Sequence, residues 1–308
     1  QRERWEDAII AYSWEQWRRT GDAEWPVQLA MVKSAVRAMD AVQEFVGRLT
    51  GAVAIDGFVI TGASKRGWTT WLTAAVDERV VAIAPLVIDL LNTRESFRHH
   101  RKVYGFYAPA VHDYEEMGIF DWLETPEAAE LMEIVDPFSY RDRLTMPKLM
   151  INASGDQFFL PDSSRFYYHA LEGPKWLRYV PNVGHGLKES DFDETLLMFY
   201  MGVIYGWQIP RYEFAYLEDG GIRVTTGQRP TAVRLWQATN PEVRDFRIDE
   251  LGPVWTSRPV ETDEEGAYEA RVDAPEKGFT AWFIELTYDS PGRYPYKFTT
   301  GVRITPDY

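Results

Sequence analysis

Apolar positions in the first part of the chain recur every three or four residues, which is the period of an amphipathic helix. Gly21-Asp22 and Pro26 interrupt this pattern, because glycine, aspartate and proline favour turns over helix interiors. Residues 3–49 therefore predict two helices joined by a turn. The second helix carries one apolar stripe, made of Val27, Met31, Ala35, Ala38, Val42, Phe45 and Leu49.

Short apolar runs then alternate with helical patterns as far as residue 206. Continuous apolar runs of this length are typical of strands that are covered on both faces, and the runs lie at 56–61, 80–88, 148–153 and 176–180. Helices are predicted at 65–76, 163–171 and 191–206, with a helical insertion at 90–145. Strands separated by helices favour a parallel sheet, because parallel pairing needs a crossover connection.

The pattern changes near Gln208-Ile209-Pro210. About seven short β-rich runs follow, with turn signals every 8–12 residues, which is typical of an all-β sandwich. The sequence therefore predicts an α/β domain at 1–208 and a sandwich of immunoglobulin or fibronectin type at 209–308.

Charge and cysteine content exclude several classes of function. The 308 residues carry a net charge of −14, which argues against nucleic acid or an anionic membrane surface as the main partner. The absence of cysteine excludes disulfides and a thiol nucleophile. No apolar run is long enough to predict a membrane-spanning helix, and the charged N-terminus does not have the shape of a signal peptide.

Three residues at the ends of predicted strands form a candidate catalytic set. Ser64 follows the first strand, Asp156 the third and His185 the fourth. The order Ser, acid, His is that of an α/β-hydrolase, in which the histidine takes the serine proton and the carboxylate orients the imidazole. Because the carboxyl ends of parallel strands share one edge of the sheet, the three side chains are expected to meet there.

The stretch around the serine reads Gly62-Ala63-Ser64-Lys65-Arg66-Gly67, so the second glycine lies one place later than in G-x-S-x-G. Its small residues permit a tight strand-to-helix turn. The backbone N–H of Lys65 is the expected oxyanion donor. Arg66, Trp68 and Phe158 are the expected contacts with substrate.

A second oxyanion donor normally comes from a loop that precedes the nucleophile. No glycine-rich loop precedes Ser64 in this sequence. Either an N-terminal portion with further strands is lost or lies on another chain, or the side chain of Lys65 or Arg66 takes part.

Other candidate residues have alternative interpretations. Ser64 and Asp156 are also ordinary turn residues, and Asp89 is the reserve acid. His99-His100, between Arg98 and Arg101, could bind an acidic group, although a solvated basic stretch is the simpler interpretation. The spacing around His112 matches no established metal-ligand motif, so neither metal nor cofactor is expected. The aromatic residues of the insertion predict either a lid or local packing.

Two runs of the sequence resemble a known family. TGASKRGWTTWLTAAVDERVVAIAPLVIDLLN and MINASGDQFFLPDSSRFYYHAL look like the PhoPQ-activated pathogenicity-related proteins. The resemblance implies an α/β-hydrolase-like domain with a C-terminal β domain, and Ser64, Asp156 and His185 as nucleophile, acid and base. The family name points to bacterial regulation, and an extracellular or periplasmic location is expected. The elbow spacing is also similar to that of glucuronoyl esterases.

The leading hypothesis is a serine hydrolase that acts on an ester, with an amide or peptide bond as the second choice. Its substrate would be a small molecule or a peptide or glycan ester. One alternative is a catalytically weak binding or scaffold protein that keeps the fold. Another is a carbohydrate esterase whose β domain binds sugar. The oligomeric state stays open.

Overall fold

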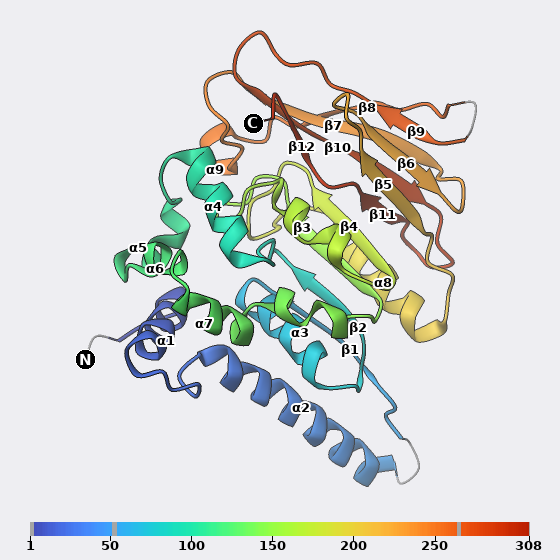
Figure 1. Cartoon of the computed structure of the whole chain (residues 1–308). Coiled ribbons are helices and arrows are strands. Elements are labelled where there is room, and N and C mark those ends of the chain that lie inside the picture. Colours follow the sequence, from blue (N-terminus) through green and yellow to red (C-terminus); the bar gives the residue numbers. More distant parts are fainter. Residues whose placement is uncertain (1–2, 51–53, 264–265, 308) are drawn as a thin grey trace. The chain divides into compact units, whose positions relative to one another are not determined.

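The computed structural model describes residues 3–50, 54–263 and 266–307 (Figure 1). Four strands form a parallel sheet in the order β1-β2-β3-β4, and two antiparallel sheets follow in the C-terminal part. The four strands are β1 (Phe58–Ala63), β2 (Val80–Leu86), β3 (Lys148–Ala153) and β4 (Lys175–Val180). The prediction of an α/β region followed by an all-β region is confirmed.

The chain divides into two compact units. The first contains Gln1–Lys148 and Phe166–Lys175, and the second contains Leu149–Arg165 and Trp176–Tyr308. The domain boundary expected at residue 208 stays a prediction.

The first unit begins with the two predicted helices, α1 (Asp7–Thr20) and α2 (Val27–Thr50). Gly21 ends α1 in a left-handed conformation (φ 68°), and its N–H donates to the carbonyl of Trp17, as is typical of a glycine after a helix. α3 (Lys65–Val76) packs on β1 and β2. These two strands pair in parallel, with Ala63 opposite Leu86 at their carboxyl ends.

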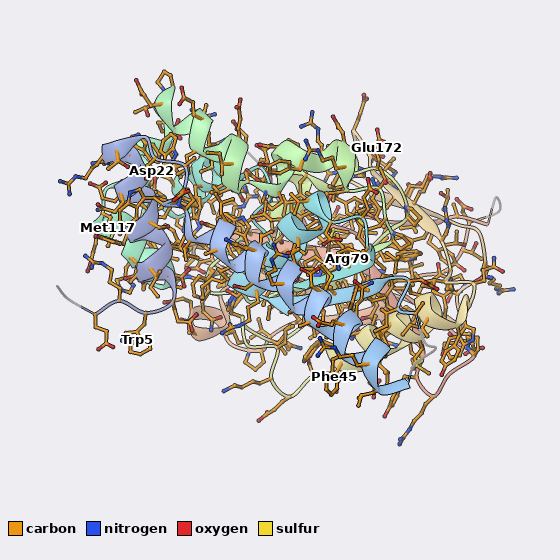
Figure 2. All side chains as sticks on the ribbon, turned by 90° about the horizontal axis from the view of Figure 1, so that it is seen from below. Trp5, Asp22, Phe45, Arg79, Met117 and Glu172 are labelled. Carbon is orange, nitrogen blue, oxygen red and sulfur yellow. The ribbon has the colours of Figure 1, made fainter. Side chains whose placement is uncertain are left out.

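The apolar stripe of α2 is a helical face as predicted, but much of it is open. Phe45 is 62% exposed and Leu49 is 69% exposed, and Phe45 lies at the surface of the helix (Figure 2). Other stripe residues line a groove of about 560 Å³ together with β1 and α3, among them Met31, Ala35, Ala38 and Val42. Gln28, Val32 and Met39, which lie next to the stripe on α2, are buried.

The predicted insertion is helical. It contains α4 (Thr93–Tyr104), α5 (His112–Glu116), α6 (Ile119–Leu123) and α7 (Glu127–Val135), with 3₁₀ turns at Pro109–Val111 and Pro137–Arg143. Its aromatic rings contact one another: Phe120 lies 4.6 Å from Phe97 and 3.9 Å from Tyr107, measured between ring centroids. Phe97 and Phe120 are buried. These contacts favour local packing over the lid interpretation for these three residues.

Lys148, at the start of β3, is a fully buried lysine. Its Nζ donates to the carbonyl of Glu172. Burial, with a smaller contribution from the nearby charge of Lys175, lowers the pKa of Lys148 from 10.5 to about 7, because an ammonium group loses its hydration in the interior.

The stability of the protein is expected to depend on pH through Lys148. Between about pH 7 and 10.5 the unfolded chain holds a proton on Lys148 that the folded chain lacks, so the free energy of unfolding rises with pH. Lys148→Met removes this linkage. Relative to the wild type, the variant should be most stable below pH 7, and its advantage should shrink towards pH 10. Urea denaturation across this range measures the gap, and a constant gap would contradict the assignment.

The second unit carries the two antiparallel sheets. One has the order β11-β10-β7-β8, with β12 also paired to β10, and the other has the order β5-β6-β9. Their bounds are β5 (Tyr212–Tyr216), β6 (Ile222–Thr226), β7 (Ala232–Asn240), β8 (Thr256–Pro259), β9 (Tyr268–Ala270), β10 (Phe279–Tyr288), β11 (Tyr296–Thr299) and β12 (Arg303–Thr305). The described part of the unit also contains α8 (Phe192–Tyr205) and the short α9 (Ile248–Leu251).

The prediction of a helix at 163–171 is wrong. Two 3₁₀ turns, Ser163–Phe166 and Tyr168–Ala170, occupy this segment. The Ser163 hydroxyl donates to the carbonyl of Leu160, a local bond of the kind that competes with helix formation. Tyr167 interrupts the segment with φ −143°, which lies outside the helical range.

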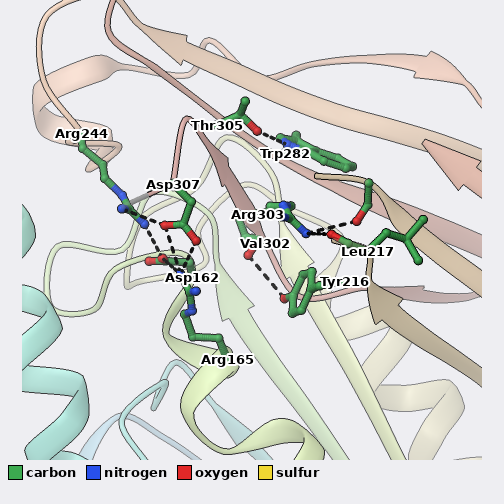
Figure 3. Close-up of polar contacts among 11 residues, drawn as sticks. Asp162, Arg165, Tyr216, Leu217, Arg244, Trp282, Val302, Arg303, Thr305 and Asp307 are labelled. Atoms are coloured by element: carbon green, nitrogen blue, oxygen red, sulfur yellow. Dashed lines mark hydrogen bonds and ion pairs between the residues drawn. The ribbon is translucent and has the colours of Figure 1, made fainter. Parts of the chain in front are cut away.

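A cluster of four charged side chains ties three segments of the second unit together (Figure 3). Arg244 Nη2 donates to Asp162 at 2.6 Å, and its Nη1 lies 3.2 Å from Asp307. Arg165 also contacts both carboxylates. Arg244 is 3% exposed and Asp162 is 1% exposed. The cluster thus joins the loop after β3, the segment after β7 and the end of the chain.

Candidate active site

Ser64 lies in the sharp turn between β1 and α3, as the sequence predicts. Its backbone has φ 55° and ψ −123°, values that are unfavourable for a residue with a Cβ atom. Its N–H donates to the carbonyl of Leu86 at 2.8 Å, and its own carbonyl accepts from Trp68. Glu6 has nearly the same conformation at the start of α1, so the strained backbone alone does not single out a nucleophile.

The two glycines of the elbow are required by close approach. A Cβ atom on Gly62 would lie 2.5 Å from the carbonyl oxygen of Arg66. A Cβ atom on Gly67 would lie 2.8 Å from the carbonyl oxygen of Gly62 and 2.9 Å from Ile88. The spacing G-x-S-x-x-G therefore matches a turn in which the first residues of α3 fold tightly against the end of β1.

Gly62→Ala is expected to destabilise the first unit, because the added methyl group meets backbone atoms that cannot move aside. Overpacking of this kind typically costs about 1–3 kcal/mol. Gly47→Ala is the matched control, since no atom lies within 4 Å of a Cβ at that position and alanine favours a helix by up to about 1 kcal/mol over glycine. Thermal unfolding measures both, and equal melting temperatures for the two variants would contradict the packing argument.

The side chains that follow Ser64 have distinct environments. Lys65 Nζ lies 2.8 Å from Asp7 and 3.3 Å from Glu6, which directs it to the start of α1. The Arg66 side chain is exposed and lines the groove beside α2. Trp68 is 4% exposed, and its indole donates to the carbonyl of Val135. A substrate contact by Arg66 or Trp68 stays a prediction, and the burial of Trp68 favours a packing role.

Asp156 and His185 form a hydrogen-bonded pair in the second unit. His185 Nδ1 lies 2.9 Å from Oδ2 and 3.0 Å from Oδ1 of Asp156. Asp156 is 4% exposed, and its Oδ1 also accepts from the N–H groups of Phe158 and Phe159. These bonds hold the carboxylate in place, and a carboxylate at Nδ1 favours the tautomer that leaves Nε2 as a proton acceptor.

The other ring nitrogen of His185, Nε2, has a different environment from Nδ1. Nε2 is buried and has no hydrogen-bond partner within the described parts of the chain. A buried polar atom without a partner is unfavourable, and a catalytic role is one of the explanations for it. Phe158 lies beside the ring, with 4.2 Å between the centroids, and a substrate contact by Phe158 stays a prediction.

The structure brings together two of the three predicted catalytic residues. Ser64 belongs to the first unit, whereas Asp156 and His185 belong to the second. Gln157 was not among the candidates, yet its Oε1 accepts the N–H of His185 at 2.9 Å. A glutamine in a loop carries no sequence signal for such a bond, so only its position next to Asp156 could have suggested it.

The alternative candidates have other partners. Asp89 is buried and accepts from the hydroxyl of Tyr167 at 2.6 Å. His100 is also buried, and its Nε2 accepts from the N–H of Ala108. His112 Nδ1 lies 2.9 Å from the carbonyl of Pro109. Among the described residues no group of three or more histidine and acidic side chains could hold a metal ion.

No helix in the described residues is both long and apolar enough to cross a membrane.

Comparisons with known proteins place most of the chain in one group. The model of the family described as PhoPQ-activated pathogenicity-related protein matches residues 1–247. The chain is also 38% identical over 333 aligned residues to autocrine proliferation repressor protein A of Dictyostelium discoideum. That alignment covers 99% of this chain and 67% of the relative.

Two solved structures show distant similarity. A puromycin-hydrolyzing peptidase of Mycobacterium tuberculosis has a TM-score of 0.42 and 22% identity, over 58% of this chain and 26% of that one. An acetyl xylan esterase from Paenibacillus sp. R4 has a TM-score of 0.43 and 19% identity, over 58% of this chain and 52% of that one. The chain thus spans about a quarter and about half of these proteins, and similarity at this level carries no argument about activity.

Proposed function

The chain belongs to the PhoPQ-activated pathogenicity-related protein family, and from this premise we propose that it is a serine hydrolase that cleaves carboxylic esters. The observation that carries the proposal is the Asp156–His185 pair, whose Nε2 is buried without a partner among the described residues. Such a pair is the base and orienting acid that a serine nucleophile requires. The turn at Ser64 supplies a serine on a strand-to-helix elbow.

In the proposed reaction Ser64 Oγ attacks the ester carbonyl, and His185 Nε2 takes its proton. The tetrahedral intermediate collapses, the imidazolium gives the proton to the departing alcohol, and an acyl-enzyme remains. A water molecule then attacks the acyl carbonyl while His185 takes a proton from it. The second tetrahedral intermediate collapses, the imidazolium returns the proton to Ser64 Oγ, and the carboxylic acid leaves. The N–H of Lys65 is the proposed donor to the oxyanion.

Labelling with a fluorophosphonate probe tests this assignment, since the probe reacts with an activated serine hydroxyl and loses fluoride. The wild type should become labelled, whereas Ser64→Ala and His185→Ala should not. A folded wild-type chain that stays unlabelled, or labelling that survives in Ser64→Ala, would reject the proposal. Hydrolysis of p-nitrophenyl acetate then tests ester cleavage, with the matching anilide as the comparison for amide cleavage.

The name of the Dictyostelium relative favours a second candidate, an extracellular protein that limits cell proliferation by binding a partner. A proliferation assay with added wild-type and Ser64→Ala protein separates the two candidates. An effect that both proteins exert equally would favour binding, and an effect lost in Ser64→Ala would favour hydrolysis.

A further inference from the structure

The two loops that carry Asp156 and His185 are joined by a backbone hydrogen bond and by a bond from a backbone N–H to a side chain. The N–H of Gly155 donates to the carbonyl of Val183 at 3.0 Å, and the N–H of His185 donates to the side chain of Gln157 at 2.9 Å. The residue before the acid and the residue two places before the base are thus direct partners. A displacement of either loop would change the Asp156–His185 distance.

Ile248, the first residue of α9, contacts both of these loops. Its N–H donates to the carbonyl of Gly155 at 2.9 Å. A Cβ atom on Gly155 would lie 3.0 Å from Ile248 Cβ, and a Cβ atom on Gly184 would lie 2.7 Å from Ile248 Cγ2. The residues immediately before Asp156 and His185 are therefore glycines against which one isoleucine packs.

A second contact joins the loop that carries His185 to Trp255, which follows Ile248 in the sequence. The side-chain amide of Asn182 donates to the carbonyl of Trp255 at 3.0 Å and accepts its N–H at 2.8 Å. Asn182 has φ 61°, which asparagine tolerates better than most residues. Trp255 is buried and lies 5.3 Å from Phe283 of β10. The segment from 248 to 255 is thus anchored in the core of the C-terminal sheets.

Hydrogen bonds from the C-terminal sheets also hold β4, the strand that precedes His185. The N–H of Leu177 donates to the hydroxyl of Tyr212 at 3.1 Å, and the N–H of Tyr179 donates to Thr299 Oγ1 at 2.9 Å. Backbone donors on one side of β4 are therefore satisfied by hydroxyl groups from the C-terminal sheets, which is one way to cover a strand edge.

We propose that the C-terminal β region acts as the positioning element of the Asp156–His185 pair, with Ile248 as the principal positioning residue. The contacts of Ile248 with Gly155 and Gly184 set the separation of the two loops. The hydrogen bonds between Asn182 and Trp255 fix the position of the loop that carries His185. This role differs from that of a separable sugar-binding module. Its effect on catalysis rests on the proposed hydrolase function, whereas its effect on the pair itself does not.

The test compares Ile248→Ala and Ile248→Val in the full chain. The first readout is the low-field proton resonance of His185 Nδ1–H, assigned by its loss in His185→Gln. The second is the kcat and KM for p-nitrophenyl acetate. Ile248→Ala should lose the resonance and lower kcat by about 10- to 100-fold with KM nearly unchanged, as expected when reacting groups are misplaced. Ile248→Val, which keeps the branched Cβ, should retain both.

Ile209→Ala is the matched control. Ile209 is half-buried in the same unit and also packs against a glycine, with its Cγ1 2.8 Å from a Cβ built on Gly202. This variant should keep the resonance and the wild-type kcat.

A retained resonance in Ile248→Ala would overturn the proposal, as would an equal loss in Ile209→Ala. If the wild type fails to hydrolyse the ester but Ile248→Ala alone loses the resonance, the positioning role stands and the proposed hydrolase function fails.

Discussion

Replacing Asp156 with asparagine is expected to lower kcat for the proposed ester hydrolysis by about 1,000- to 10,000-fold with little change in KM. The shape of the side chain is kept, but the negative charge that faces His185 Nδ1 at 2.9 Å is lost. The imidazole then lacks the partner that selects its tautomer and stabilises its protonated form. Steady-state kinetics with p-nitrophenyl acetate measure the effect.

Two further carboxylates serve as controls for this variant. Asp193→Asn changes an acidic residue in the first turn of α8, and its activity should match the wild type. Asp89→Asn tests the reserve acid, which accepts a hydrogen bond from Tyr167. A large loss of kcat in Asp89→Asn together with a small loss in Asp156→Asn would show that the acid has been assigned to the wrong residue.

The local pattern of the sequence is sufficient to predict the elements that form the elbow around Ser64. A β-branched run, a small-residue turn and a helical pattern predict β1, the turn at Ser64 and α3, and the structure has all three. Each of these signals depends on neighbours within a few residues. The same kind of signal predicts Asp156 and His185 as site residues, because each follows a strand whose apolar run is distinct, and the structure pairs the two side chains.

Contacts between distant segments could not be predicted in this way. Ile248 meets Gly155 and Gly184 across a wide separation in sequence, and nothing in the sequence near Ile248 indicates a partner. The stripe of α2 shows the same limit, since helical periodicity identifies the apolar face but not what covers it. Phe45 and Leu49 belong to that face and are largely exposed.

Burial also determines how strongly the charged cluster of the second unit affects the stability of the fold. Arg244→Met is expected to lower the free energy of unfolding by about 3 kcal/mol, because Asp162 would keep a buried charge after losing its closest cation. This is the lower end of the usual range for breaking a buried pair. Arg165 still lies 3.4 Å from Asp162, but its side chain is 39% exposed, so it compensates only in part. Chemical denaturation followed by tryptophan fluorescence gives the value.

Arg271→Met is the matched control, because Arg271 pairs with Asp219 where both side chains are at least half exposed. Arg271 also contacts Glu269. Solvent screens such exposed contacts, so the loss of Arg271 should lower the free energy of unfolding much less than the loss of Arg244 does. The double variant Asp162→Leu with Arg244→Met removes the carboxylate as well, and it should be more stable than Arg244→Met alone. A double variant that is less stable than the single one would show that the Asp162 carboxylate stabilises the fold through its other contacts, and that the buried charge is not the source of the loss.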